Sequence, residues 1–591
     1  MKKAGSATLL SKAIKVTLIA TIMASSFQAV SQSIEVIERN DRPTPADIII
    51  MNADIRTSDA SVPRAQALAI KDGKFIAVGS QHYIKLLQDK HTRVLDAHGN
   101  TIIPGIIDAH THLIVGTDLM DGIDLFGIKD KEQWLSMVKE KAASLPKGSW
   151  IFGGRWDASQ TADKTLPTAA DLDKVSPDHP VALIDVDYHT MWVNSKALQE
   201  LDINDQTKNP TGGTIQRDSN GKATGILQEN AIDIYNNSPK VIAAQGNKSD
   251  KLRKIIHHFN SLGVTGVHDM WTNVGSEYID MLKKDGYPMR VWYGYMVDTN
   301  EKKSGEEAFK KQAELQKQMN NFAKLREKDI GKGPMYRYGY HKYYMDGTLL
   351  NRTAALHEPY ADTHDHFLGK PLFTQRRMDE LVQLSHKYGF PVAIHAIGDN
   401  AVSMALQSFK DSPDGNDKIN RIEHIELSKF SDMEKFAQQG VIPSMQPDHA
   451  ISGNFQEERL GKARLQRGWA WQSLLTAGGH LVFGSDWPTA KEDPMLQLGD
   501  ATLREKDGRT WHGENALSFD EALYAYTQAP AKISGWDKEI GSITVGKWAD
   551  FAIVDGKIKD PIPQDIRSWK ISQTWFAGEK VYDREQPNDK L

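Results

Sequence analysis

Short apolar runs alternate with longer stretches of helical pattern between residues 105 and 488, and this alternation constrains the fold more than any other feature. Strands that alternate with helices form parallel sheets, and eight of them close a (β/α)8 barrel of the TIM type. We therefore predict an α/β protein built on such a barrel. Its predicted strands are Gly105–Leu113, Val264–Met270, Met289–Val297, Arg337–Gly347, Pro391–Asp399, Arg421–Glu426, Val441–Pro447 and His480–Pro488.

Two further units are expected around the barrel, which we place at residues 104–539. The gap between its first two strands is far longer than one helix and contains strand-like runs, Pro180–Val186 and Gly225–Leu227. It predicts a large insertion after the first strand, a subdomain at about residues 120–250. β-rich runs also occur near both ends of the chain, with the hairpin signal Asp72-Gly73 among them. These ends are predicted to pair into one small β-sandwich domain, residues 45–103 and 540–585.

The first 31 residues have the order of a secretory signal peptide. Lys2 and Lys3 precede the apolar run Val16–Ala24, which small and polar residues follow up to Ser31. The apolar run is much shorter than the ~20 residues that a membrane-spanning helix needs. We expect cleavage near Ser31 and export, most simply to a bacterial periplasm, with no stable membrane anchor after cleavage.

Composition excludes several kinds of site and partner. The chain has 591 residues and no Cys, so neither disulfides nor thiolate metal ligands can form. Its formal net charge of -5 is small for this length, and nucleic acid is therefore not an expected partner. Any metal ion must bind to His, carboxylate or modified Lys side chains.

The first predicted strand carries the pair His110 and His112. Because side chains alternate along a strand, Asp108, His110 and His112 share one face, with the two imidazoles about 7 Å apart along it. Two imidazoles on one face can bind a single ion. A His-x-His pair alone is nevertheless better explained as packed or exposed histidines, so the interpretation as a metal site depends on the later strands.

Three later strands each carry a further potential ligand. His395 and His424 lie near the C-terminal ends of the fifth and sixth predicted strands, and Asp486 lies near the end of the eighth. In a barrel these ends converge on one mouth, where active sites lie. Taken singly, each histidine is explained equally well as a hydrogen-bonded structural residue or as a metal ligand, and Asp486 alone is explained as a helix cap. Five such groups on strands of one barrel predict a metal site.

Lys342 stands within the fourth predicted strand. A lysine inside a buried strand is costly unless its charge is removed or paired. One interpretation is a rim residue that pairs with a carboxylate such as Asp346. The other is an uncharged amine carbamylated by carbon dioxide (a carboxylated lysine), whose anionic oxygens bridge two cations.

Together these segments resemble the amidohydrolase superfamily, and within it the amidohydrolase family 3 group that includes N-substituted formamide deformylase and the YtcJ-like proteins. The resemblance extends from Asp47 to about Tyr582. It implies six metal ligands: His110, His112 and Asp486 for a more buried ion, His395 and His424 for a second ion, and carbamylated Lys342 as the bridge.

These ligands predict a hydrolytic mechanism. A hydroxide held between two divalent ions has a lowered pKa and attacks an amide-like carbonyl at neutral pH. Asp486 accepts the proton of the water and delivers it to the leaving nitrogen, which makes it the predicted catalytic residue. Zinc is the preferred ion because imidazole-rich sites suit it, with one or two ions per chain.

Two regions supply candidates for substrate contact. One is the insertion, where the segment Asp187–Ser195 resembles a family segment over the barrel mouth, although a hydrophobic hinge inside the subdomain explains it equally well. The other is the set of strand ends around the mouth. The candidates are Trp156, His189, Trp192 and Asn194 in the insertion, His268 at the end of the second strand, and His449 after the seventh strand.

The predicted function is exported, metal-dependent hydrolysis of a C–N bond in an N-substituted formamide or N-acyl amine. Two alternatives stay open. One is hydrolysis of another amide or ester, such as a cyclic imide or N-acyl amino acid, and the other is a non-catalytic regulatory or binding protein on the same fold. The expected partner is a small amide-like molecule, and a homodimer is the default for a large soluble enzyme.

Overall fold

The computed structural model describes residues 44–586 with short gaps. The gaps are residues 114–115, 117–118, 121, 187, 211–212, 271–274, 298–305, 330–332, 416, 454, 559–561 and 563. The predicted signal peptide lies outside the described residues, as does Asp187. No helix in the described part of the chain is long and apolar enough to cross a membrane.

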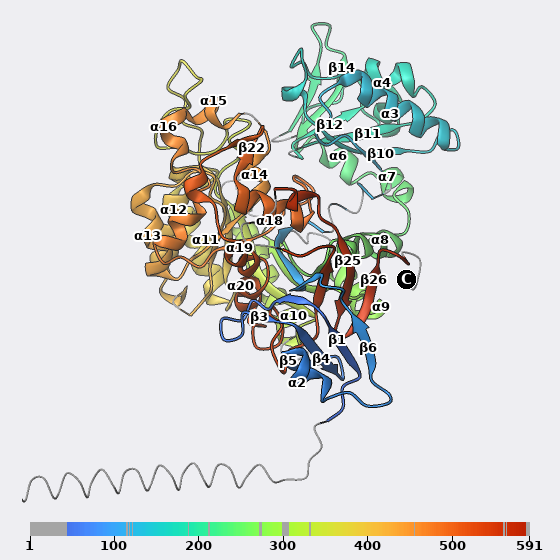
Figure 1. Cartoon of the computed structure of the whole chain (residues 1–591). Coiled ribbons are helices and arrows are strands. Elements are labelled where there is room, and N and C mark those ends of the chain that lie inside the picture. Colours follow the sequence, from blue (N-terminus) through green and yellow to red (C-terminus); the bar gives the residue numbers. More distant parts are fainter. Residues whose placement is uncertain are drawn as a thin grey trace, which may run out of the picture.

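The centre of the molecule is an eight-stranded parallel sheet whose strand order follows the chain (Figure 1). Each strand overlaps one of the predicted runs, which confirms the predicted barrel. The first and last strands meet, because Thr111 bridges Trp487 in parallel and Asp486 N donates to His110 O at 2.7 Å. The strands are β8 (Ile106–Thr111), β15 (Val264–Asp269), β16 (Arg290–Met296), β17 (Tyr336–Tyr344), β18 (Val392–Ala396), β19 (Arg421–His424), β20 (Ile442–Met445) and β21 (Val482–Phe483).

Closure of the barrel brings the backbone of β8 into contact with the segment after β21. A Cβ atom on Gly484 would lie 2.2 Å from the amide nitrogen of His110, so only glycine allows this approach. The Asp108 carboxylate fastens the same junction, because it accepts hydrogen bonds from Ser485 N at 2.9 Å and Ser485 Oγ at 2.5 Å. The segments that carry His110 and Asp486 are therefore held side by side.

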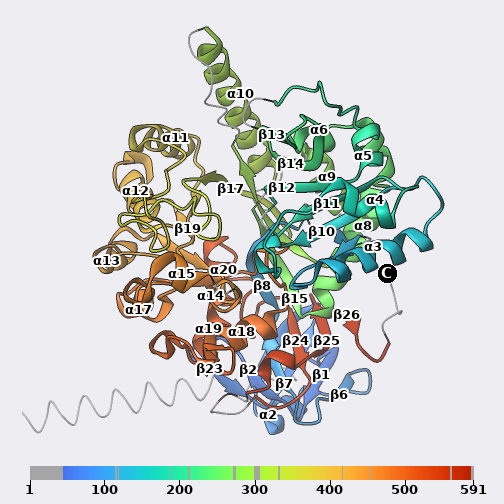
Figure 2. The same cartoon turned by 90° about the horizontal axis from the view of Figure 1, so that it is seen from above.

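Helices cover the outside of the barrel. In α8 (Lys248–Ser261), the buried residues Leu252, Ile255 and Phe259 recur at helical spacing and pack one face onto the main core. Figure 2 shows that α10 projects from the body of the molecule. The other described helices after the barrel strands are α9 (Gly275–Asp285), α10 (Glu306–Asp329), α11 (Gln375–Lys387), α12 (Asp399–Lys410), α13 (Phe430–Gln439), α14 (Pro447–Ile451), α15 (Gln456–Leu460), α16 (Lys462–Leu465), α17 (Trp471–Thr476), α18 (Pro494–Leu503), α19 (Phe519–Ala525) and α20 (Gln528–Ile533).

The two ends of the chain form a second unit of two packed sheets. Ile50 and Leu68 from the first sheet share one core cluster with Ile102, Phe551 and Trp575 from the second. The first sheet contains β5 (Lys74–Gly79), β4 (Ala67–Lys71), β1 (Ile48–Met51) and β6 (Arg93–Asp96). The second contains β26 (Glu579–Asp583), β25 (Ile571–Phe576), β24 (Phe551–Val554), β7 (Thr101–Pro104), β2 (Asp54–Arg56) and β3 (Arg64–Ala65).

The insertion after β8 forms a third unit with its own six-stranded sheet. Figure 1 shows it at the end of the molecule away from the two packed terminal sheets. Its core is aromatic, since Trp134, Trp156 and Trp192 pack with ring centroids 6.2 to 6.4 Å apart. In sheet order the strands are β13 (Gly213–Arg217), β14 (Ala223–Glu229), β12 (Thr190–Val193), β11 (Val181–Asp185), β10 (Ile151–Trp156) and β9 (Ile123–Asp124), and the longest helix is α3 (Lys131–Ser144).

Candidate active site

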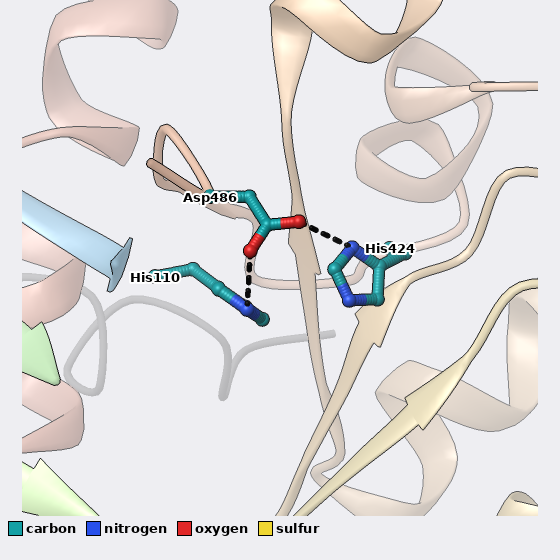
Figure 3. A group of neighbouring side chains, drawn as sticks. All are labelled: His110, His424 and Asp486. Atoms are coloured by element: carbon teal, nitrogen blue, oxygen red, sulfur yellow. Dashed lines mark ion pairs between the residues drawn. The ribbon is translucent and has the colours of Figure 1, made fainter. Parts of the chain in front are cut away.

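Three of the predicted ligands meet at the barrel mouth. His110 from β8, His424 from the end of β19 and Asp486 after β21 each offer a ligand atom within 4.8 Å of the others (Figure 3). Asp486 Oδ1 lies 3.2 Å from His110 Nε2, and Asp486 Oδ2 lies 3.8 Å from His424 Nδ1. All three side chains are buried. Their donor atoms converge as a metal-binding cluster requires.

The other two predicted histidines extend this cluster. His112 Nε2 lies 3.2 Å from Asp486 Oδ1, so one carboxylate oxygen faces both imidazoles of the His-x-His pair. His395 joins the cluster through His424. The ring centroids of His395 and His424 are 4.5 Å apart, and those of His424 and His110 are 4.8 Å apart. Four imidazoles and one carboxylate therefore form a continuous group.

Burial keeps three of these imidazoles uncharged at neutral pH. It lowers the pKa of His395 to about 3, and it also lowers the pKa of His112 and of His424. Uncharged imidazole is the form that binds metal ions. At neutral pH these three side chains are therefore ready to act as ligands.

Lys342 lies in the barrel interior, and only 1% of it is exposed. Its Nζ has no hydrogen-bond partner among the described residues, and it lies 5.0 Å from the ring of Tyr344. Burial lowers the pKa of Lys342 to about 8. The alternative pairing with Asp346 is wrong, because that carboxylate accepts hydrogen bonds from three backbone amides, those of Ala355, Ile397 and Gly398.

The backbone after β19 has a conformation that sequence reasoning missed. Residues alternate along a strand, so Glu423 and His424 would face opposite sides. His424 and Ile425 have φ angles of 75° and 50°, in the left-handed region, and this twist lets both Glu423 and His424 contact His110. Asp486 also has a positive φ, 58°. Strained backbone of this kind clusters at functional sites.

Glu423 is the first residue of the site that the motif did not indicate. Its Oε2 lies 2.6 Å from His110 Nδ1, and it is fully buried. Arg421 donates to both carboxylate oxygens, at 2.5 Å and 2.9 Å. Burial by itself raises the pKa of Glu423, but the charge of Arg421 outweighs it and holds the pKa well below the usual value. The alternation of charged Arg421 and Glu423 on a buried strand was the signal available in the sequence.

Arg421 also connects the neighbouring strands beneath the cluster. It donates to Ala109 O and to Ser444 Oγ, both at 2.6 Å. Its Nη1 lies 3.0 Å from His268 Nδ1. The predicted substrate candidate His268 is therefore a buried neighbour of Arg421, and no described contact joins it to the metal-binding cluster.

His449, the other candidate at a strand end, does lie at the cluster. Its Nε2 is 3.6 Å from Asp486 Oδ2 and its Nδ1 is 3.3 Å from Glu426 Oε1. The ring stacks on that of His424, with centroids 5.8 Å apart and planes 4° apart. Burial lowers the pKa of His449, but the hydrogen bond to Glu426 and the charge of Asp486 outweigh it and raise the pKa overall.

Three of the candidates in the insertion lie in its interior. Trp156 and Trp192 are 2% and 1% exposed, and their indole N–H groups donate to Leu183 O and Thr168 O inside the subdomain. Asn194 is fully buried, and its side chain caps α5 (Ser195–Glu200) by accepting from Ala197 N at 2.9 Å. Side chains packed and hydrogen-bonded in this way build the subdomain, which favours the structural interpretation of these three residues over substrate contact.

The remaining candidate, His189, is exposed and lies 3.0 Å from Glu229 on the neighbouring β14. Arg155, next to the predicted Trp156, is a residue of the insertion that does reach the barrel. Arg155 donates to Pro488 O at 3.0 Å and pairs with Asp124. The sequence pattern predicted a substrate contact for Trp156, whereas the contact with the barrel is made by the neighbouring Arg155.

The donor set fits a divalent ion. His110, His424 and Asp486 satisfy the spacing for a shared ion, and the described residues leave Lys342 Nζ buried without a hydrogen bond. Imidazole and carboxylate are ligands that zinc and its neighbours in the periodic table accept. A barrel with such a cluster at its mouth defines the class of metal-dependent hydrolases.

The chain belongs to the amidohydrolase family, because the profile of that family matches residues 93–582. It is 30% identical to "Protein LONG AFTER FAR-RED 3" of Arabidopsis thaliana, over 91% of this chain and 92% of that protein. It is 27% identical to N-substituted formamide deformylase of Arthrobacter pascens, over 91% and 98%. These matches confirm the resemblance inferred from the motifs.

A solved structure has the same fold. An uncharacterized metal-dependent hydrolase from Pyrococcus furiosus superposes with a TM-score of 0.66 at 25% identity, covering 87% of this chain and all of that one. The protein is therefore a hydrolase of the amidohydrolase family with the barrel and metal-binding cluster described above.

Proposed function

We propose that this hydrolase cleaves a C–N bond in an amide-like small molecule, with N-substituted formamides or N-acyl amines as the substrate class. One observation carries the proposal. A single carboxylate, that of Asp486, lies between the imidazoles of His110, His112 and His424 at the barrel mouth. The formamide deformylase, which this chain matches over nearly the whole length of both proteins, supports the choice of substrate class.

The ligands in this proposal are the cluster residues. His110, His112 and Asp486 would hold one ion, His395 and His424 would hold a second, and carbamylated Lys342 would supply oxygen ligands. When bound, divalent ions, with zinc as our choice, lower the pKa of water and polarise a carbonyl oxygen. The amine of Lys342 suits carbamylation because burial lowers its pKa to about 8, which leaves an uncharged fraction to attack carbon dioxide.

Asp486 carries the proton in this scheme. The positive φ of Asp486 and the bond from its amide to His110 O fix its backbone, while its Oδ2 faces His449 at 3.6 Å. Oδ2 accepts a proton from the attacking water and then donates it to the leaving nitrogen. His449, held by Glu426 at 3.3 Å, contacts the substrate carbonyl or carboxylate.

The test is a hydrolysis screen with variants matched for burial. Zinc-loaded protein is assayed against formamides, N-acyl amines, cyclic imides and N-acyl amino acids. Asp486→Asn is expected to abolish turnover. The folding control is Asp399→Asn, a change at a buried aspartate of α12 that pairs with Arg467, and it is expected to keep turnover.

The alternatives have distinct outcomes. Turnover of imides or N-acyl amino acids alone replaces the substrate class but keeps the enzyme. No turnover in any class, with less than about one bound divalent ion per chain, supports a non-catalytic regulatory or binding protein.

Export and a homodimer are also parts of the proposal. The mass of protein purified from cells that export it is expected to match loss of the first 31 residues, and an uncleaved chain contradicts export. Size-exclusion chromatography with light scattering is expected to give twice the chain mass.

A further inference from the structure

Only four Lys or Arg side chains in the described part of the chain are 2% exposed or less. For one of them, Arg504, neither an ion pair nor the metal-binding cluster explains why a charged side chain is buried. Arg290 pairs with Asp550, and Arg421 pairs with Glu423. The third is Lys342 of the metal-binding cluster. The fourth, Arg504, is fully buried at the C-terminal end of α18 and has no carboxylate within 4 Å among the described residues.

The two carboxylates whose charges act on Arg504 from a distance each pair with another side chain. Asp500, one turn earlier in α18, lies 2.6 Å from Arg567. Glu514 lies 2.9 Å from His512. Removing a guanidinium from water without a counter-charge is expensive. Asp500 and Glu514 offset the charge of Arg504 only in part, since neither pairs with it and burial outweighs their attraction.

Neighbouring groups cover the faces and part of the edge of the Arg504 guanidinium. Its Cζ lies 4.3 Å from the ring of Trp471 and 4.6 Å from that of Trp511, at cation–π distances. Its Nε donates to Trp511 O at 3.2 Å and its Nη1 to Trp469 O at 3.4 Å. Nη2 has no partner among the described residues. One edge of a flat cation thus remains available.

The same neighbourhood contains other buried donors without a described partner. They are the indole N–H groups of Trp469 and Trp471 and the side-chain Nδ2 of Asn515, all in residues that are 1% exposed or less, and the acceptor Oδ1 of Asn515 also lacks a described partner. Asn515 lies in η4 (Gly513–Asn515), which packs on α17, where Trp471 lies. Arg and Trp side chains only donate hydrogen bonds, so what they lack is an acceptor.

We propose that the cluster of Trp469, Trp471, Arg504, Trp511 and Asn515, the Arg504 cluster, binds a small monoanion at the Nη2 edge of Arg504. A halide and a formate-sized carboxylate share the required chemistry, because each accepts several hydrogen bonds and carries one negative charge. We expect a ligand of this size because Arg504 is fully buried and two indoles lie over its guanidinium. A neutral acceptor satisfies the N–H groups but leaves the charge of Arg504 unbalanced.

The Arg504 cluster is separate from the metal ligands, and the proposal does not depend on the reaction. The two regions are linked through Glu426, since Trp469 N donates to its carbonyl at 3.0 Å while its carboxylate lies 3.3 Å from His449. Burial lowers the pKa of Arg504 to about 9, so the side chain is still a cation at neutral pH.

Crystals soaked in sodium bromide give the direct test. An anomalous peak within about 3.5 Å of Arg504 Nη2 is the expected result. A parallel soak in sodium formate distinguishes a halide site from a carboxylate site. Density for a planar ligand in the formate soak, with no anomalous peak in the bromide soak, identifies a carboxylate site. Only ordered water at this edge in both soaks overturns the proposal.

Melting temperatures test the same site in solution. A ligand that binds only the folded state raises the melting temperature as its concentration exceeds the Kd. The rise with bromide or formate is expected to be smaller for Trp471→Phe, which keeps the stacked ring and removes one donor. Arg504→Met is expected to abolish it.

Trp192→Phe is the matched control, because its indole N–H is bonded to Thr168 O in the insertion. It is expected to lower the melting temperature but to keep the full response to the anion. Equal responses in Trp471→Phe, Trp192→Phe and the parent protein overturn the proposal, even if Arg504→Met fails to fold.

Discussion

The guanidinium of Arg155 donates a 3.0 Å hydrogen bond to the carbonyl oxygen of Pro488. Arg155 belongs to β10 of the insertion, and Pro488 follows Asp486 by two residues. An ion pair with Asp124 on β9 holds the guanidinium in place. The insertion is thereby tied to the backbone segment that positions the proposed proton carrier.

Breaking this tie should slow the reaction. We predict that Arg155→Met lowers kcat by about 10- to 100-fold, because small misplacements of a reacting group have effects of this size. The control is Arg217→Met, whose guanidinium donates only within the insertion, to Thr207 O and Gly221 O among others. Steady-state kinetics with the best substrate compare the two, and equal losses would show that the insertion matters only as a folded unit.

Glu423 should matter for metal affinity. Its 2.6 Å contact with His110 Nδ1 directs the other ring nitrogen toward Asp486, and such partners typically contribute 10- to 100-fold to affinity. We predict that Glu423→Gln weakens zinc binding by about that factor, measured by competition with a chelator. The absorption spectrum of the cobalt-loaded protein should change as well, because it reports ligand geometry.

The matched control for Glu423→Gln is Asp550→Asn. This change breaks another deeply buried bidentate ion pair, in which Arg290 donates to the two carboxylate oxygens of Asp550 at 2.5 and 2.9 Å. That pair joins the barrel to the terminal sheets and lies outside the metal-binding cluster. Asp550→Asn should lower stability yet leave zinc affinity unchanged. A parallel loss of affinity in both variants would show that Glu423 acts only through stability.

Replacing Lys342 should separate stability from metal binding. Burial lowers its pKa from 10.5 to about 8, so at pH 7 the folded state holds an unfavourable charge. We predict that Lys342→Met stabilises the metal-free protein on the order of 3 kcal/mol at pH 7, since one pKa unit is worth about 1.4 kcal/mol. The same variant should lose tight metal binding and turnover.

The pH dependence of this gain has a definite sign. Below pH 8 the lysine is charged in both the folded and unfolded states, and the full penalty applies. Between pH 8 and 10.5 the folded state releases its proton first, so the gain should shrink as pH rises. Denaturant unfolding of the metal-free proteins measures it, and a gain that grows with pH would refute this account.

Gly484 should be essential for barrel closure. An added Cβ would lie 2.2 Å from His110 N, so Gly484→Ala forces β8 and the Asp486 segment apart. We predict a destabilisation of at least about 1–3 kcal/mol, the range for overpacked sites, together with lost metal binding. Gly79→Ala, where an added Cβ meets nothing within 4 Å, should change neither. Thermal unfolding and metal content decide the comparison.

Much of this architecture could be predicted because strands and ligands follow local rules. Each barrel strand overlaps its predicted run, since apolar runs bounded by breakers are a property of the chain itself. His110 and His112 share a face because side chains alternate along a strand. The pattern was less informative in the insertion, where Trp156, Trp192 and Asn194 serve its packing. A tryptophan that packs in a core and one that lines a site look alike in sequence.

The sequence by itself determined the order of the strands, the family and the residue types available for a metal site. Only the tertiary structure decided which long-range contacts those residues make. Glu423 contacts His110, and Arg155 donates to the carbonyl oxygen of Pro488. Arg504 is buried and forms no ion pair with a described carboxylate. The reason is physical. Strand periodicity sets the face on which a side chain lies. The left-handed backbone of residues such as His424, and the close approach of Gly484 to His110, depend instead on barrel closure. Closure joins segments that are hundreds of residues apart in the chain.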